Sequence, residues 1–395
     1  MFWCCILGGV IPIYLDEKNH DKIESIAEVL DKFYLFKYKE TSKETKSYPH
    51  KNIISIKHID QEFPKDNEGV IWDGRKYEDP LFIQLSSGST NRVPKLIPIN
   101  TKQLNYHIYC FNKMNNWEYG YEFSLNWLPL DHVVPMIDIF RNIVNESPQL
   151  IVAKDNIIQN PSLWLDLITH YKISRTWAPN FGFQLLLNNL LQINNESNNW
   201  NLTSLKSVFN AGEQVNSLMI SKLNEYLRRF GGISIKPAYG MAEMGSYITY
   251  ANSNSITFYS SSFRLNPDDE IIYSEGGNVA IACVGKVMPG MKIIVTDIYG
   301  NKLKDKKIGY IKTKGVTLFN GYIGKNTNDF DDNGWYDTGD MGFIFNNELY
   351  ITGRSKESLI INGTHYFNFD IENTIREIDG VRSTDIAVSI IKNSF

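Results

Sequence analysis

The sequence has few of the residues from which disulfide frameworks and metal clusters are built. Its 395 residues include 4 cysteines, two of them adjacent and none in a Cys-x-x-Cys spacing. The 7 histidines are scattered, without a His-x-x-x-His pair. This pattern is typical of reduced core thiols, and it argues against a cysteine-based zinc module or a disulfide-stapled secreted domain.

Positive charge is not in excess either. The net charge is −4 and the isoelectric point is about 6.0, which argues against a nucleic-acid partner. The apolar start, Met1 to Leu15, lacks a basic leader and is too short to cross a bilayer, so we expect a cytoplasmic protein without a transmembrane segment. This start predicts a buried helix end, a Gly-Gly turn and a buried strand at 10–15, as if an N-terminal portion were missing.

What is present is a globular composition, with 43% hydrophobic, 21% charged and 13% aromatic residues. Strands alternate with helices up to about residue 252, which predicts βαβ units and a mainly parallel sheet. Further along, short strands separated by turns predict an antiparallel region. The fold class is therefore α/β. We expect a large N-terminal domain of several subdomains at 1–352, with a β-rich part at about 254–352, and the start of a small α+β C-terminal domain at 353–395.

The periodicity and capping signals place the individual elements. The expected helices are 21–33, 101–117, 162–172 after an Asn160-Pro161 start, 181–193, one capped by Asn216 and one capped by Asn368. The expected strands are 10–15, 52–59, 124–129, 173–177, 207–209, 233–236, 278–284, 291–298, 308–314, 348–352 and 358–361. Residues 334–340 read as a turn-rich loop with two carboxylates.

One loop is unusually rich in hydroxyl groups. It lies between the apolar runs 81–83 and 96–99, which predicts a strand, a tight loop and a second strand. Such a loop can surround a phosphate chain with amide and hydroxyl donors, although it lacks the Walker A spacing. The alternative is an ordinary Ser/Thr hairpin turn. The loop residues concerned are Ser86, Ser87, Gly88, Ser89 and Thr90, with the cation of Lys95 nearby.

Taken in order, several loops resemble the core motifs of the adenylate-forming (AMP-binding) superfamily. This superfamily includes acyl-CoA synthetases, fatty acyl-AMP ligases and the adenylation domains of nonribosomal peptide synthetases. The segments that carry the resemblance are 87–95, 210–213, 239–243, 336–340 and 353–356. The segments 127–132 and 356–363, together with Ala242, are most similar to the fatty acyl-AMP ligase branch and related megasynthase domains.

The resemblance implies ATP-dependent adenylation of a carboxylic acid, a fatty or other acyl chain, with Mg²⁺ as cofactor and release of pyrophosphate. Coenzyme A or an acyl or peptidyl carrier protein would then accept the acyl group on a thiol. By the same resemblance, Ser87, Gly88, Ser89, Thr90 and Lys95 hold the outer phosphates. Adenine lies between Gly212-Glu213 and Tyr239-Gly240, Glu243 holds the metal, Asp340 and Arg354 meet the ribose, Lys356 marks a hinge, and His132 lies beside the acyl group.

Each of these residues also has an ordinary interpretation. Glu243 could be an exposed loop acid, Asp340 an Asx-turn residue, and His132 a satisfied core histidine. Three departures from the family pattern bear on activity. Asn91 replaces a usual Gly, Ala242 replaces a frequent Thr, and the sequence stops before the position of a late catalytic lysine.

Two rival functions therefore stay open. One is amino-acid adenylation in a nonribosomal peptide synthetase, for which Asp131 is the nearest candidate to pair with a substrate ammonium group. The other is a non-catalytic remnant or interaction module. A structural protein without a ligand would leave the ordered loops unexplained.

Overall fold

The computed structural model describes the chain in segments: 2–15, 22–30, 33–37, 51–55, 74–86, 94–192, 199–252, 255–260, 266–277, 279–324, 329–361, 364–376, 378, 381 and 386–388. These segments form two compact units. The first comprises Met1–Lys102, Leu130–His132 and Phe319–Thr327, and the second comprises the rest.

The described part of the first unit contains two strand pairs and two short helices. Strands β1 (Phe33–Lys37) and β2 (Lys51–Ser55) are parallel, whereas β3 (Pro80–Ser86) and β4 (Lys95–Asn100) are antiparallel. The β3–β4 pair confirms the two predicted strands, whereas the loop between them lies outside the described residues. Its helices are α1 (Phe2–Leu7) and α2 (Lys22–Val29). Buried Ile26, Ile83 and Leu96 form the core of this unit.

Three sequence-based expectations for this unit are wrong. The predicted buried helix end is mostly not buried, since Cys5 is the only buried residue of α1. Residues 10–15 contribute only an isolated bridge at Ile13, not a strand. The predicted helix 21–33 ends at Val29, and Phe33 already begins β1. Apolar spacing at the end of a helix does not distinguish one further turn from the start of a strand, because a short apolar run fits both periods.

The second unit contains an 11-stranded sheet of order β14-β15-β16-β17-β13-β10-β9-β8-β7-β5-β6. Its parallel part has β5 (Ser124–Asn126), β6 (Gln149–Ile151), β7 (Arg175–Ala178), β8 (Ser207–Asn210) and β9 (Ile235–Met241). Its antiparallel part has β10 (Ser246–Tyr250), β13 (Cys283–Val287), β14 (Met291–Thr296), β15 (Gly309–Gly315), β16 (Tyr336–Phe345) and β17 (Glu348–Arg354).

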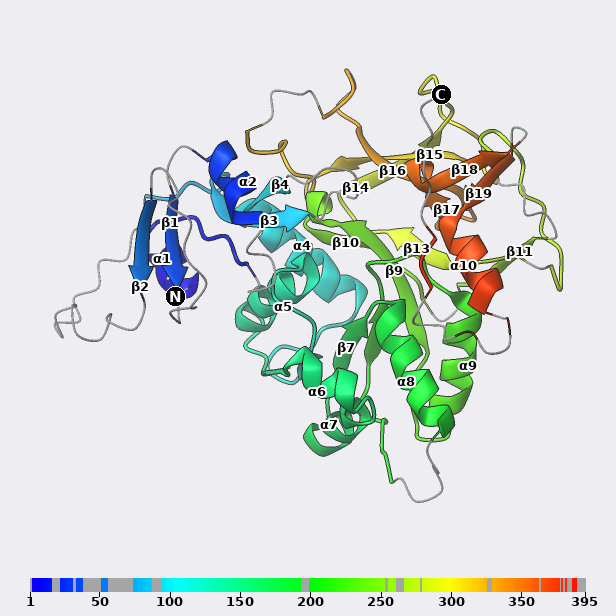
Figure 1. Cartoon of the computed structure of the whole chain (residues 1–395), viewed down its shortest axis with the longest axis horizontal. Coiled ribbons are helices and arrows are strands. Elements are labelled where there is room, and N and C mark those ends of the chain that lie inside the picture. Colours follow the sequence, from blue (N-terminus) through cyan, green and yellow to red (C-terminus); the bar gives the residue numbers. More distant parts are fainter. Residues whose placement is uncertain are drawn as a thin grey trace. The chain divides into compact units, whose positions relative to one another are not determined.

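Helices cover both faces of the parallel part, as the green and cyan ribbons of Figure 1 show. On one face, α7 (Leu163–Tyr171), α8 (Asn180–Gln192) and α9 (Ser217–Arg228) bury the main core. On the other, rings from α4 (Thr101–Met114) pack against those of β8 and β10. Both the parallel and the antiparallel arrangements confirm the predicted α/β fold class.

The described part of the second unit contains further helices, strands and 3₁₀ turns. They are α5 (Val133–Val144), α6 (Lys154–Gln159), β11 (Phe258–Ser260), β12 (Val279–Ile281), β18 (Ser358–Ile361), β19 (Thr364–Phe367), α10 (Asn368–Arg376) and the 3₁₀ turns Ala242–Met244 and Ser355–Glu357. None of the described helices is both long and apolar enough to cross a membrane.

The structure corrects two details and adds a helix that the periodicity did not indicate. Asn160 ends α6 rather than starting a helix, and Ser162 is the N-cap of α7. Residues 336–345 form β16 and not a loop, because Tyr336, Thr338 and Asp340 alternate into the interior. Helix α5 was not predicted, since its apolar pattern is interrupted by a buried ion pair between Asp138 and Arg141.

Candidate functional site

The predicted site residues of the second unit begin at the carboxyl ends of β8 and β9. These neighbouring strands are parallel, so Asn210 and Met241 end them at the same edge of the sheet. Gly212 and Glu213 follow β8 and are exposed, whereas Glu243 lies in the 3₁₀ turn after β9 and is 5% exposed. Ligands of open α/β sheets bind at this kind of edge.

The loop after β8 is held by a residue that the sequence did not single out. The Asn180 side chain accepts hydrogen bonds from the Asn210 amide (2.8 Å) and the Asn216 backbone N–H (3.2 Å), and it donates to the Gln214 carbonyl. Gln214 also donates to the Thr352 carbonyl in β17 (3.1 Å). This loop is therefore fixed at both sides. The only sequence signal was an Asn after Ala-Pro at the start of an apolar helix.

Asp340 is the centre of the most specific polar cluster. Its buried carboxylate accepts a hydrogen bond from the Tyr239 hydroxyl on Oδ2 (2.7 Å) and one from Arg354 Nε on Oδ1 (3.1 Å). Arg354 is half exposed and also lies 3.8 Å from Glu357. The structure thus brings three of the predicted nucleotide-binding residues together from β9, β16 and β17.

This contact requires a strongly curled sheet. Three strands lie between β16 and β9 in the sheet order, so the two strands are four spacings apart. In a flat sheet this would be about 19 Å, at about 4.8 Å per spacing. The hydroxyl and the carboxylate nevertheless meet at 2.7 Å. The sheet therefore bends between its parallel and antiparallel parts, and the bend closes the predicted site around Asp340.

Burial dominates the electrostatics of this cluster. Burial raises the pKa of Asp340, and Arg354 and the Tyr239 hydroxyl only partly offset that rise. Burial and the nearby Asp340 charge raise the pKa of Tyr239 well above its usual range, so its hydroxyl stays protonated as a donor. The pKa of Arg354 is raised, because Asp340 and Glu357 more than offset its partial burial.

Gly240 and Gly212 have different physical roles. A side chain on Gly240 would lie 2.2 Å from the Ser246 carbonyl, so β9 and β10 can approach only where this residue is glycine. Gly212 has a φ of 92° and open space around it, so its requirement is conformational. Neither glycine has a side chain that could obstruct a planar ligand at this edge.

The donor set suits a magnesium ion that arrives with a nucleotide. Within the described segments, no group of three or more His, Cys, Asp or Glu side chains could hold a metal. Mg²⁺ commonly takes one or two protein carboxylates and completes its shell with phosphate oxygens and water. A single buried carboxylate at Glu243 fits that role and not a permanent all-protein site.

The first unit contains the other predicted residues. Lys95 donates to the Tyr322 hydroxyl (3.0 Å) and lies 4.6 Å from the centre of that ring. His132 is exposed, which excludes the satisfied core histidine. Ser86 ends β3, opposite Lys95 in β4. Ser87, Gly88, Ser89 and Thr90 lie outside the described residues.

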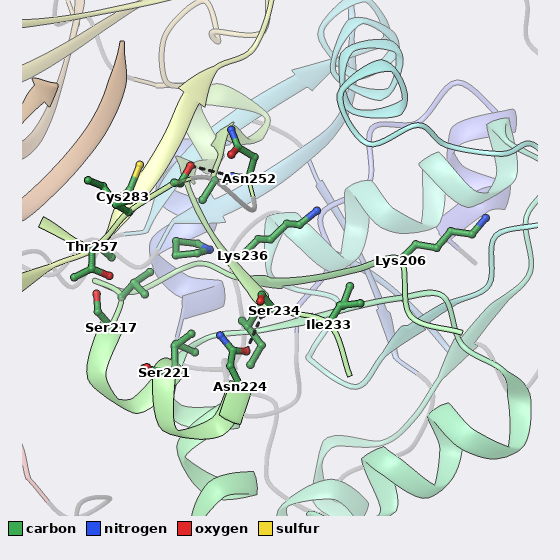
Figure 2. Close-up of a pocket in the computed structure, with 18 residues that line it drawn as sticks. Lys206, Ser217, Ser221, Asn224, Ile233, Ser234, Lys236, Asn252, Thr257 and Cys283 are labelled. Atoms are coloured by element: carbon green, nitrogen blue, oxygen red, sulfur yellow. Dashed lines mark hydrogen bonds between the residues drawn. The ribbon is translucent and has the colours of Figure 1, made fainter. Parts of the chain in front are cut away.

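A cavity of about 440 Å³ lies at the other edge of the sheet, near the start of β9 (Figure 2). Lys206, Lys236 and one face of α9 line it. Several of its polar groups are already engaged. Lys206 pairs with Glu118 and Glu122, and the Asn224 side chain accepts a hydrogen bond from the Ile235 N–H. None of the predicted site residues belongs to it.

The known proteins with similar sequences include nonribosomal peptide synthetases, a putative ligase and a putative acyl-CoA synthetase. The chain is 34% identical over 267 residues to the nonribosomal peptide synthetase apvA of Aspergillus terreus, which covers 65% of this chain and 27% of that protein. It is 26% identical to the aspulvinone E synthetase melA of the same species, over 95% of this chain and 40% of the relative. The chain thus spans less than half the length of these two curated relatives.

Solved structures agree in fold. A structure of McyG A-PCP complexed with phenylalanyl-adenylate has a TM-score of 0.81 at 29% identity, covering 96% of this chain and 68% of that one. An adenylation domain of a keto acid-selecting nonribosomal peptide synthetase module has a TM-score of 0.79 at 25% identity, covering 96% and 72%. A fatty acyl-adenylate ligase structure, at 19% identity and a TM-score of 0.82, shows the fold alone.

The family model described as AMP-binding enzyme matches residues 14–323. That span contains Tyr239 and the loops after β8 and β9, whereas Asp340 and Arg354 lie a short distance beyond it. The chain belongs to the AMP-binding enzyme family.

Proposed function

We propose that the chain activates a carboxylic acid with ATP, forming an acyl-adenylate and releasing pyrophosphate. The observation that carries this proposal is the buried Asp340 carboxylate, held by Tyr239 and Arg354 beside a sheet edge that also presents Glu243. A substrate carboxylate oxygen bonds to the α-phosphorus as the bond to pyrophosphate breaks. The protein contributes by positioning these groups and stabilising charge as it develops.

In this proposal Asp340 accepts the ribose hydroxyls, and Gly212, Glu213, Tyr239 and Gly240 border the adenine. Glu243 holds Mg²⁺, which neutralises phosphate charge when it is bound. Arg354 stays near the ribose. The remaining roles rest on the motif order: Ser87, Gly88, Ser89, Thr90 and Lys95 contact the outer phosphates, and His132 lies beside the acyl group.

The substrate is proposed to be a carboxylic acid of the kind that nonribosomal peptide synthetases activate. The similar proteins at 25% identity or above include such synthetases, and two of the solved domains are described with phenylalanyl and keto acyl adenylates. A fatty acid is the rival substrate, favoured by the segments 127–132 and 356–363. The thiol of a carrier protein or of coenzyme A is the proposed acceptor.

Calorimetric titration with non-hydrolysable adenylate mimics tests both statements. Mimics carrying an amino acid, an α-keto acid and a long-chain fatty acid are compared on the same chain. Micromolar or tighter binding of the first or second, and at least tenfold weaker binding of the third, is expected. A preference for the fatty mimic would reverse the substrate proposal, and no binding by folded protein would contradict adenylation.

The metal role is tested by Glu243→Ala. The variant should lose most of the gain in ATP affinity that Mg²⁺ gives the wild type, because the buried carboxylate proposed to hold the ion is removed. Glu225, exposed on α9, offers a matched control, Glu225→Ala. Equal Mg²⁺-ATP affinity in Glu243→Ala and wild type would refute the assignment.

A further inference from the structure

The two oxygens of Asp340 differ in how firmly their partners are held. The Tyr239 hydroxyl bonded to Oδ2 belongs to a ring that is 9% exposed, in the middle of β9. Arg354, bonded to Oδ1, is half exposed at the end of β17 and has Glu357 as a second partner. Only the second partner can leave the carboxylate without disturbing the core.

We infer that Tyr239 is a positioning residue, whose hydroxyl fixes Asp340 through Oδ2 so that Oδ1 can exchange Arg354 for a hydroxyl group of the ligand. This inference rests on the proposed binding of a ribose by Asp340. It gives Tyr239 a role beyond that of an aromatic surface, because a phenyl ring would supply the surface but not the hydrogen bond.

The chemistry of the pair supports this assignment. A carboxylate that accepts hydrogen bonds from two ligand hydroxyls must present its free lone pairs in a defined direction. A short bond to a fixed buried donor sets that direction, and bonds to a charged acceptor are stronger than neutral ones. Because the pKa of Tyr239 is raised well above its usual range, the hydroxyl stays protonated near neutral pH and can donate to Asp340.

The contact joins two strands that lie apart in the sheet order, but other bonds hold the backbone of Asp340. Tyr239 and Asp340 are 101 positions apart in the chain and separated by three strands in the sheet. Within the described part of the second unit, the backbone of Asp340 is held separately, by a hydrogen bond from its N–H to the Thr338 hydroxyl (3.1 Å). The Tyr239 bond therefore acts on the carboxylate itself and not on the course of the strand.

The test measures the affinity of ATP and of 2′,3′-dideoxy-ATP for wild type, Tyr239→Phe and Asp340→Ala. The ratio of the two affinities reports the use of the ribose hydroxyls. Tyr239→Phe should reduce ATP affinity about tenfold, the usual scale for losing a buried hydrogen bond to a charged group. It should change dideoxy-ATP affinity less than twofold, because that ligand makes no bond to Asp340.

Tyr250→Phe is the matched control. Tyr250 is equally buried in the neighbouring strand β10, and its hydroxyl donates to the Tyr247 carbonyl (3.1 Å) instead of to Asp340. It should leave the ratio unchanged. Should Tyr239→Phe not fold, 3-fluorotyrosine at position 239 keeps the hydroxyl as a stronger donor, and it should preserve or increase the ratio.

The possible failures are distinguishable. Equal losses for both nucleotides in Tyr239→Phe, or a lowered ratio with 3-fluorotyrosine, would overturn the positioning role. If Asp340→Ala removes the preference for ATP over 2′,3′-dideoxy-ATP while Tyr239→Phe keeps it, the ribose assignment stands and this inference fails. If wild type itself does not distinguish the two nucleotides, the proposed role of Asp340 fails first.

Discussion

Two buried carboxylates of the second unit, Glu122 and Asp340, each pair with an arginine, and they differ in almost everything else. Glu122 receives hydrogen bonds from Ser174, Arg175, Lys206 and the Glu118 backbone at 2.6 to 3.3 Å, and Arg175 is 5% exposed. Asp340 has two side-chain donors, and Arg354 is 49% exposed. A fully enclosed, fully bonded acid stabilises the fold, whereas an acid with one replaceable partner can serve a ligand.

The largest effect is expected from a substitution that breaks the buried Glu122–Arg175 ion pair. Glu122→Gln keeps the shape but removes the charge that faces Arg175, leaving a buried guanidinium without its anion. Removing one partner of a buried pair costs about 3–5 kcal/mol. Urea denaturation should show a loss of that size. The control is Glu118→Gln, since Glu118 is 61% exposed and also bonds Lys206. A Glu122→Gln variant as stable as this control would break the comparison.

Removing the charge of Asp340 should instead affect binding. Asp340→Asn keeps one acceptor oxygen, but it loses the anion that Arg354 and the ligand hydroxyls share. We expect ATP affinity to fall at least tenfold, which is about 1.4 kcal/mol, with a thermal midpoint close to that of wild type. Calorimetry and thermal denaturation on one preparation measure both. A large loss of stability with unchanged affinity would make Asp340 a structural acid like Glu122.

The two acids should also titrate on opposite sides of their usual values. Burial alone would raise the pKa of Glu122, but Ser174, Arg175 and Lys206 lower it. Its stabilising effect is therefore present above the unfolded-state pKa of about 4.3 and is lost as pH falls through the lower folded value. Asp340 behaves oppositely. Burial raises its folded pKa, so its contribution to stability is present at low pH and is lost as pH rises through that value.

Denaturation at a series of pH values sharpens the comparison. The difference in stability between wild type and Glu122→Gln should persist at pH 5 and shrink only in stronger acid. ATP affinity should weaken on acidification at a pH above the usual aspartate pKa, because a protonated Asp340 can no longer accept hydrogen bonds from both ribose hydroxyls. The charged and titratable groups around Asp340 are Tyr239, Arg354 and Glu357. Coincident pH midpoints for the two effects would contradict the assignment of opposite shifts.

The sequence reveals these regions unequally. The helix–strand alternation predicted the parallel sheet, and Asn216 caps α9 as expected, accepting a hydrogen bond from the Met219 N–H (3.0 Å). Local periodicity and capping explain that success. Asp340 was identified by motif order, but its bond to Tyr239 depends on how the sheet curls between three other strands. No local pattern encodes that curvature.

Glu122 was missed for a related reason. It lies in a short acidic and aromatic stretch that reads as a surface loop, and Arg175 is 53 positions away. Asn180 was missed likewise, because its partners Asn210, Gln214 and Asn216 belong to the next loop of the sheet edge. Buried polar contacts between elements distant in sequence have no fixed spacing, so they become visible only in the folded chain.

The smallest expected effect concerns Lys206, the outermost partner of Glu122. Its side chain is 41% exposed and divides its bonds between Glu118 (3.0 Å) and Glu122 (3.2 Å). Exposed pairs contribute about 0–1 kcal/mol, because water screens the charges and the long side chain loses freedom. Lys206→Met should therefore cost less than about 1 kcal/mol in urea denaturation, while Glu122 keeps Ser174 and Arg175. A loss approaching that of Glu122→Gln would mean that the lysine, and not the buried arginine, is the principal counter-ion of this acid.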